Sequence, residues 1–148
     1  MKKEGIASLY WYATNLGKWS LIQGITTTLG NKTRIKSTMQ QVLDLNESFY
    51  HGAPHRYFGV YEAKVPGGSI KASGKSFDRA IELSGDYLDT HVLKAQYFAA
   101  KTQNEELFKS LLKKVGEADP KKIPELEIEN RNAQRIAKKM LVDIEDFF

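Results

Sequence analysis

Apolar residues that recur three and four positions apart are the feature of this 148-residue sequence that most limits its fold. The pattern begins near Ile6 and continues to Ile144, with glycine or proline between many of its segments. Such spacing places the apolar side chains on one face of a helix, whereas a half-buried strand needs strict alternation. A run of three threonines at 26–28 is locally strand-like but has no alternating partner. The sequence therefore predicts about seven helices, no strand and an all-α fold.

Polar residues that favour helix starts give approximate bounds. We expect four of them to act as N-caps, because a short side-chain oxygen can accept a hydrogen bond from the first turn: Asn31, Ser69, Asp86 and Asn104. The first helix either ends at Gly17 or continues towards Ile22, and the local sequence does not decide between these alternatives.

The segment from Phe49 to Gly68 has its own start and stop signals. Pro54 suits a first helical turn, and the turn-forming triplet at 66–68 cannot continue a helix. Between them, Gly59 removes a side chain where a neighbouring helix can approach closely. We therefore expect a helix of about three turns that packs against another helix.

Residues 41–49 and 79–87 are similar to each other, each containing the end of one helix, a short turn and an aromatic residue. This unit resembles the tetratricopeptide repeat, which has a small residue in its first helix and a small–aromatic–small series in its second. Gly59 fits the first position, and Ser73, Phe77 and Ala80 fit the series. The longer inter-helix loop and Gly85 depart from the pattern, so a degenerate repeat is predicted.

The repeat implies a stack of helical hairpins, an α-solenoid, in which each hairpin covers the face that its neighbour leaves open. We predict a single domain over 1–148. Its expected parts are hairpins at approximately 6–45, 52–84 and 87–117 and a long capping helix at 125–148.

Composition excludes several classes of protein. The hydrophobic fraction of 41% and the charged fraction of 27% are ordinary for a folded chain, and the apolar runs are too short for a transmembrane helix. Zero cysteines exclude disulfides and thiolate sites. The net charge of +4 is concentrated towards the amino terminus without a basic stripe, so nucleic-acid binding is not expected.

An ordered set of motifs resembles a more specific family, the T component (TatT) of tripartite ATP-independent periplasmic (TRAP) transporters. The motifs are Leu9-Tyr10-Trp11-Tyr12-Ala13, Asn15-Leu16-Gly17-Lys18-Trp19, Gly52-Ala53-Pro54-His55-Arg56, Gly59-Val60-Tyr61, Pro66-Gly67-Gly68, Phe77-Asp78-Arg79-Ala80-Ile81, Glu106-Leu107-Phe108 and Pro124-Glu125-Leu126 near Asn130. Together they extend over nearly the whole chain.

This resemblance implies a periplasmic, non-enzymatic scaffold that binds the solute-binding P component of the transporter and forms a trimer. Full members of the family are exported lipoproteins and are considerably longer. The resemblance therefore implies that this chain is a carboxy-terminal portion, without their signal peptide and lipid-bearing cysteine. An uncovered first hairpin would favour self-association.

Six residues are candidates for contact with a partner or ligand: Tyr10, Trp11, Trp19, His55, Arg56 and Tyr61. The aromatic candidates either pack within the hairpins or line an interface or ligand channel. His55 and Arg56 either pair internally, with an acid such as Glu62 or Asp86, or contact a partner or an anion.

Catalytic, metal and cofactor sites find little support. His51 and His55 have the spacing of a helical metal pair, but Gly52 and Pro54 interrupt the helix between them. A Gly-Lys-Ser run at 74–76 lacks the upstream glycines and strand of a phosphate loop. We therefore expect no enzyme and no cofactor, and the alternatives are a hydrophobic-ligand-binding module or a general protein-interaction repeat.

Overall fold

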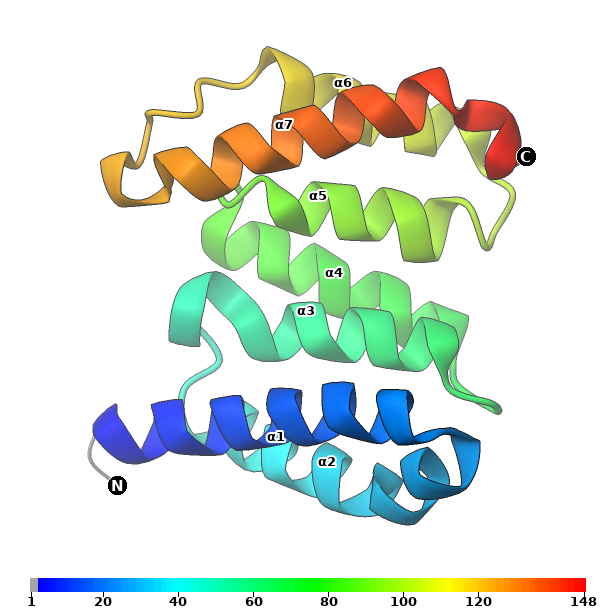
Figure 1. The fold of residues 1–148 in the computed structure, drawn as a ribbon. Helices are drawn as coiled ribbons and strands as arrows, with labels where there is room; N and C mark the ends of the chain where they lie inside the picture. The colour runs from blue at the N-terminus through cyan, green and yellow to red at the C-terminus, as the bar shows by residue number, and fades with distance from the viewer. Residues whose placement is uncertain (1–2) are drawn as a thin grey trace. The chain divides into compact units, whose positions relative to one another are not determined.

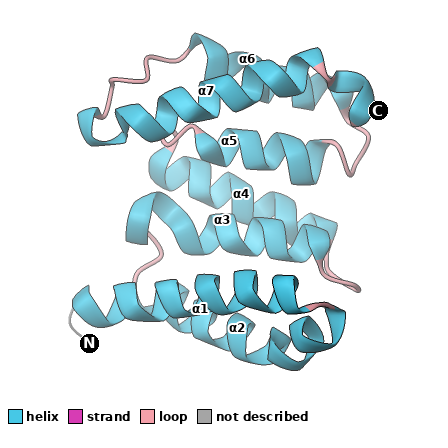
Figure 2. Cartoon of the chain, viewed as in Figure 1, coloured by secondary structure: helices cyan, strands magenta, loops and turns pink. Residues whose placement is uncertain are grey.

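The computed structural model describes residues 3–148, and this part of the chain is all-α, without a strand (Figures 1 and 2). Its helices are α1 (Lys3–Gln23), α2 (Ile25–Leu45), α3 (Phe49–Lys64), α4 (Ile70–Ser84), α5 (Asp89–Lys94), α6 (Glu105–Glu117) and α7 (Glu127–Val142). A π-helical segment, Ala95–Ala99, continues α5, and 3-10 turns lie at Pro124–Leu126 and Ile144–Asp146. The predicted all-α class is confirmed, whereas the repeat architecture stays a prediction.

The chain divides into two compact units, Met1–Pro54 (unit 1) and His55–Phe148 (unit 2). The boundary lies within α3, two residues after a run of three residues with left-handed backbone: Tyr50 (φ 43°), His51 (φ 58°) and Gly52 (φ 74°). Right-handed helix follows this kink, with Pro54 near its beginning. That position agrees with the expectation for a proline in a first turn.

Unit 1 consists mainly of α1 and α2, which lie side by side and are joined at Gly24 (Figure 1). Gly24 has a φ of 105°, which favours glycine and allows one residue to reverse the chain. The helix α1 continues through Gly17 to Gln23, which decides between the two alternatives left by the sequence. Its core side chains are mainly aliphatic: Ile6, Ala13, Ile35, Met39 and Val42.

The expected N-cap at Asn31 is wrong, because α2 begins at Ile25 and contains the three threonines. The hydroxyl of Thr28 donates to the carbonyls of Ser20 (3.0 Å) and Gly24 (2.9 Å). Inside the helix, Asn31 donates from Nδ2 to the Thr27 carbonyl (3.1 Å) and to Ser20 Oγ (3.2 Å). These bonds join α2 to the end of α1 and offset the weak helix propensity of threonine.

Unit 2 has a larger core between α5, α6 and α7. Its buried members are Leu88, Val92, Ala95, Ala99, Phe108, Leu111, Leu112, Val115, Ala133, Ala137 and Met140. The predicted packing site at Gly59 is present, because a Cβ atom built there would lie 2.8 Å from the ring of buried Phe77. The hydroxyl of Ser73 also donates to the Gly59 carbonyl (2.6 Å), so α4 lies directly against this part of α3.

Two of the predicted caps in unit 2 are confirmed, and one is wrong. Ser69 Oγ accepts from the Ala72 amide, and Asn104 Oδ1 accepts from the Leu107 amide. Asp86 does not cap the next helix, which begins at Asp89. The distant Asn130 of α7 supplies the polar contacts at this turn instead.

The side chain of Asn130 is buried and bridges the backbone before α5. Its Oδ1 accepts from the Leu88 amide (3.0 Å), and its Nδ2 donates to the Asp86 carbonyl (3.0 Å). The carboxylate of Asp86 instead accepts from Lys122 (3.0 Å). The last helix, expected from 125 to the end of the chain, follows a 3-10 turn and ends at Val142.

Candidate functional site

The candidate residues fall into two groups, one in each compact unit. Tyr10, Trp11 and Trp19 lie on α1 in unit 1, whereas His55, Arg56 and Tyr61 lie on α3 in unit 2. Within residues 3–148, no three acidic or histidine side chains are arranged to hold a metal ion. No helix in this described part is long and apolar enough to cross a membrane.

In unit 1, the rings of Tyr10, Trp11, Phe49 and Tyr50 form an aromatic patch. Tyr10 is central, with ring centroids 5.0 Å from Trp11 and 5.3 Å from Phe49, and Trp11 lies 6.4 Å from Tyr50. Trp11 and Tyr50 are 49% and 40% exposed. The patch therefore presents large apolar rings with polar tips on the surface, the residue types that most often dominate binding energy.

The kink near the start of α3 positions half of this patch. Tyr50 and His51 both have positive φ, which costs a residue with a Cβ atom of the order of 1–3 kcal/mol when the surroundings impose it. The kink places the ring of Tyr50 within 6.5 Å of Tyr10 and within 5.9 Å of the His51 ring. The patch therefore depends on a strained turn that helical periodicity does not predict.

Trp19 lies two turns beyond Trp11, about 12 Å further along α1 at 1.5 Å per residue. Its side chain is half exposed, as are those of Trp11 and Tyr12. Of the three sequence candidates in this unit, the structure brings Tyr10 and Trp11 into ring contact.

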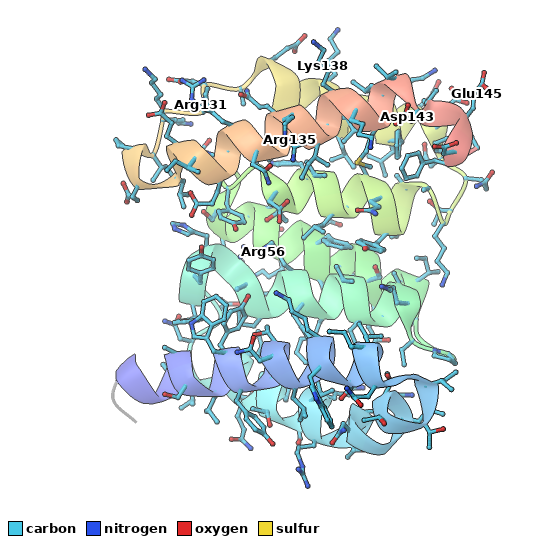
Figure 3. The ribbon with its side chains drawn as sticks, viewed as in Figure 1. Arg56, Arg131, Arg135, Lys138, Asp143 and Glu145 are labelled. Atoms are coloured by element: carbon cyan, nitrogen blue, oxygen red, sulfur yellow. The ribbon has the colours of Figure 1, made fainter. Side chains whose placement is uncertain are left out.

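In unit 2, Arg56 is a buried cation. Arg56, whose side chain is labelled in Figure 3, is only 6% exposed. Its guanidinium carbon lies 4.1 Å from the centre of the Tyr87 ring. Burial raises the pKa of Asp89, while the positive charge of Arg56 lowers it in part. The Arg56 cation therefore lies against the Tyr87 ring and interacts with the carboxyl of Asp89. This placement favours an interaction within the protein over contact with an anion in solution.

The remaining candidates of α3 are half-buried. Tyr61 stacks on Tyr57 with centroids 5.9 Å apart, and burial, followed by the charge of Glu62, raises the pKa of Tyr61. Burial, followed by the charge of Tyr61, also raises the pKa of Tyr57, so both phenols are neutral hydrogen-bonding groups at physiological pH. His55 is also half-buried, one residue before Arg56.

Sequence reasoning missed Phe49 and Tyr50 in the patch, and Tyr87 and Asp89 beside Arg56. The sequence shows two adjacent aromatic residues at 49–50 but does not predict that they contact α1, because this contact depends on the left-handed turn. Tyr87 is the aromatic residue of the repeated segment 79–87, and the repeat pattern alone gives it no role beside Arg56. Its ring meets Arg56 across 31 positions of sequence, and no local pattern specifies such a contact.

The family model of the TRAP transporter T-component matches this chain over residues 1–148. No curated protein sequence matches the chain. This chain belongs to the T-component family of TRAP transporters. Its resemblance, first seen in the ordered motifs, is thereby confirmed over the whole chain.

Several motif residues of this T-component have a structural explanation. A Cβ atom at Gly68 would lie 2.2 Å from the Glu62 carbonyl oxygen, so only glycine fits this turn. Gly59 accommodates Phe77, and the central residue of the turn, Gly67, has a φ of 75°. These three glycines of the motifs, Gly59, Gly67 and Gly68, therefore shape unit 2.

Proposed function

We propose that this T-component is an accessory subunit that binds the solute-binding P component of a TRAP system through the aromatic patch. The T-component family comprises transport accessory subunits and is not an enzyme family. The observation that carries the proposal for this chain is the surface group of rings from Tyr10, Trp11, Phe49 and Tyr50. The same proposal places the protein in the periplasm, where it meets the P component.

The chemistry of the patch suits a protein partner. Rings with few rotatable bonds lose little conformational entropy when they become buried, and a tryptophan or tyrosine often supplies a hot spot of 2 kcal/mol or more. Tyr10 and Phe49 are half-buried beneath the more exposed rings, so Trp11 and Tyr50 are already held in place. A preorganised contact of this kind reduces the entropic cost of association.

Isothermal titration calorimetry with the P component of the same TRAP system tests the proposal. We expect Trp11→Ala and Tyr50→Ala each to weaken binding by about thirtyfold, the equivalent of a 2 kcal/mol hot spot. The matched control is Ile128→Ala, which removes an exposed large apolar side chain from unit 2. No heat of binding with the folded chain at high micromolar concentration, or equal weakening by the control, would refute the proposed surface.

Self-association is a second part of the proposal, because the family resemblance implies a trimer and unit 1 exposes many apolar side chains. Multi-angle light scattering over a range of protein concentration measures this directly. A strictly monomeric chain would contradict it.

Native mass spectrometry tests the alternative function, since a retained hydrophobic small molecule would favour a ligand-binding module.

A further inference from the structure

The turn between α1 and α2 carries an exposed aliphatic surface that is not part of the aromatic patch. Four side chains flank Gly24 within nine residues: Leu21, Ile22, Ile25 and Leu29. Ile22 is 80% exposed and Ile25 is 75% exposed, and the other two are also more than half exposed. We call these four residues the hairpin tip.

The hairpin tip lies apart from the aromatic patch along unit 1. Ile22 is eleven residues beyond Trp11 on α1, which corresponds to about 16 Å along the helix. The patch gathers Tyr50 and Phe49 around the middle of α1, whereas the tip occupies the end where both helices meet (Figure 1). A partner of the patch therefore does not have to cover the tip.

The charges near the tip have one sign. Residues 5–43 contain four basic residues and no acidic residue. Lys18 precedes Ile22 by one helical turn, and Lys32 follows Ile25 by two turns, so each basic residue shares a helix face with a tip residue. At 1.5 Å per residue, these cations lie about 6 and 11 Å behind the aliphatic side chains.

Trp19 lies three residues before Ile22, on the same side of α1, and is half exposed. Exposed aliphatic side chains at a turn, followed by a tryptophan and then by lysines, match the layers of a membrane interface. The acyl boundary receives aliphatic groups, the headgroup level receives indole rings, and anionic phosphates attract lysines.

We propose that the hairpin tip inserts into the interface of a bilayer that contains anionic lipids. Leu21, Ile22, Ile25 and Leu29 enter the acyl boundary, Trp19 lies at the headgroup level, and Lys18 and Lys32 contact lipid phosphates. The absence of acidic residues from positions 5–43 favours this occupant over a partner protein of mixed surface charge, because no side chain of this segment repels an anionic surface. The contact is peripheral, since insertion by one turn of a hairpin reaches about 5–10 Å.

Vesicle flotation with the full 148-residue chain tests this inference. The vesicles contain phosphatidylcholine alone or phosphatidylcholine with 30% phosphatidylglycerol. We expect binding to the anionic vesicles, with about fivefold weaker partitioning for each lysine replaced by glutamine in Lys18→Gln and Lys32→Gln. Raising the salt concentration should reduce the electrostatic contribution to vesicle binding and leave the contribution of the aliphatic side chains unchanged.

The two tryptophans of the sequence supply an independent reading of orientation, because both lie on α1. Trp11→Phe leaves Trp19 as the only indole, and Trp19→Phe leaves Trp11. On addition of anionic vesicles, the emission of Trp19 should shift to the blue and be quenched by brominated lipid. The emission of Trp11 should change much less.

A matched pair of double variants separates the tip from general hydrophobicity. Ile22→Ser with Ile25→Ser should reduce the partition coefficient by about tenfold or more. Ile128→Ser with Val142→Ser removes two residues of unit 2 that are equally exposed, at 83% and 75%, and should leave vesicle binding unchanged. All four side chains are exposed, so circular dichroism should show the same helix content and melting transition in both double variants.

Several results would overturn the inference. It is wrong if the chain does not float with anionic vesicles, or if the two double variants bind equally. It is also wrong if Ile22→Ser with Ile25→Ser dissociates an oligomer in light scattering while vesicle binding persists, because a second copy then covers the tip. Titration with the P component distinguishes the two proposals, since the tip variants should retain that binding and Trp11→Ala should retain vesicle binding.

Discussion

Units 1 and 2 differ in how completely they bury their apolar side chains. Among residues with described side chains, nine of the twelve exposed large hydrophobic residues belong to the 54 residues of unit 1, and three belong to unit 2. Unit 2 packs α5, α6 and α7 around one core, so each helix has an inward face. The α1–α2 hairpin has one shared inner face, and its aromatic and aliphatic outer faces lie at the surface.

This contrast assigns different work to the two units. Unit 2 combines its core with buried polar bridges such as Asn130 and with the enclosed Arg56. Such internal satisfaction of polar groups stabilises one specific packing. Unit 1 presents the surfaces proposed to bind, so its substitutions should alter association more than stability.

The tryptophans allow this contrast to be measured. Both lie in α1, so tryptophan fluorescence reports on unit 1, whereas far-ultraviolet circular dichroism reports on all helices. Urea unfolding followed by the two methods therefore separates effects on the two units. Coincident transitions in every variant would show that the units unfold together.

The largest expected difference in stability is between a substitution at a glycine of unit 2 and one at a glycine of unit 1. Gly59→Leu should lower the free energy of unfolding by more than about 3 kcal/mol, because even a Cβ atom meets the Phe77 ring at 2.8 Å. Gly17→Ala should be neutral or stabilising by up to about 1 kcal/mol, because its Cβ atom would meet Ile35 at an ordinary 4.0 Å within a helix. Equal destabilisation by both substitutions would contradict the structural difference between them, in which a neighbouring ring fills the space beside Gly59 and the space beside Gly17 has room for a Cβ atom.

A smaller effect is expected from the two bridging asparagines. Asn130→Ala should cost about 2–3 kcal/mol, because it leaves the Leu88 amide and the Asp86 carbonyl without this partner in a buried turn. Asn31→Ala should cost about 1 kcal/mol, because Asn31 is half-buried and water can replace it. Urea denaturation measures both values, and a larger loss at Asn31 would contradict the assignment of the stronger polar bridge to unit 2.

The smallest effect is a pH dependence from His91 in unit 2. Burial lowers the pKa of His91, and Lys114 and Lys94 lower it further, while the hydrogen bond to the Gly85 carbonyl and the charge of Asp86 raise it. The neutral ring donates from Nε2 to that carbonyl (2.9 Å), and Nδ1 is buried without a partner among the described residues. A proton at Nδ1 would therefore lack an acceptor.

The folded state thus binds this proton less readily than the unfolded state. Stability from this group is complete above about pH 6.5, the ordinary value, and falls below it by at most about 1.4 kcal/mol per pH unit. Urea unfolding between pH 5 and 8 measures the slope. His91→Gln keeps a donor for Gly85 and should remove this contribution, so an unchanged slope in that variant would exclude His91 as its source.

The sequence by itself determined the all-α class, the end of α2, the caps at Ser69 and Asn104, and the close approach at Gly59. Each depends on local spacing or on the chemistry of one residue, so a single sequence contains the necessary information. The ordered motifs also determined the family, which the match over residues 1–148 confirms.

Only the tertiary structure decided which residues meet. At the turn before α5, the polar contacts come from Asn130 and not from the side chain of Asp86, 44 residues earlier. The buried amide of Asn130 bridges two backbone groups there. Arg56 met Tyr87, and a left-handed turn brought Tyr50 to Trp11. These contacts depend on the packing of separate helices and on one strained turn. Helical periodicity in the sequence predicts neither the packing nor the turn.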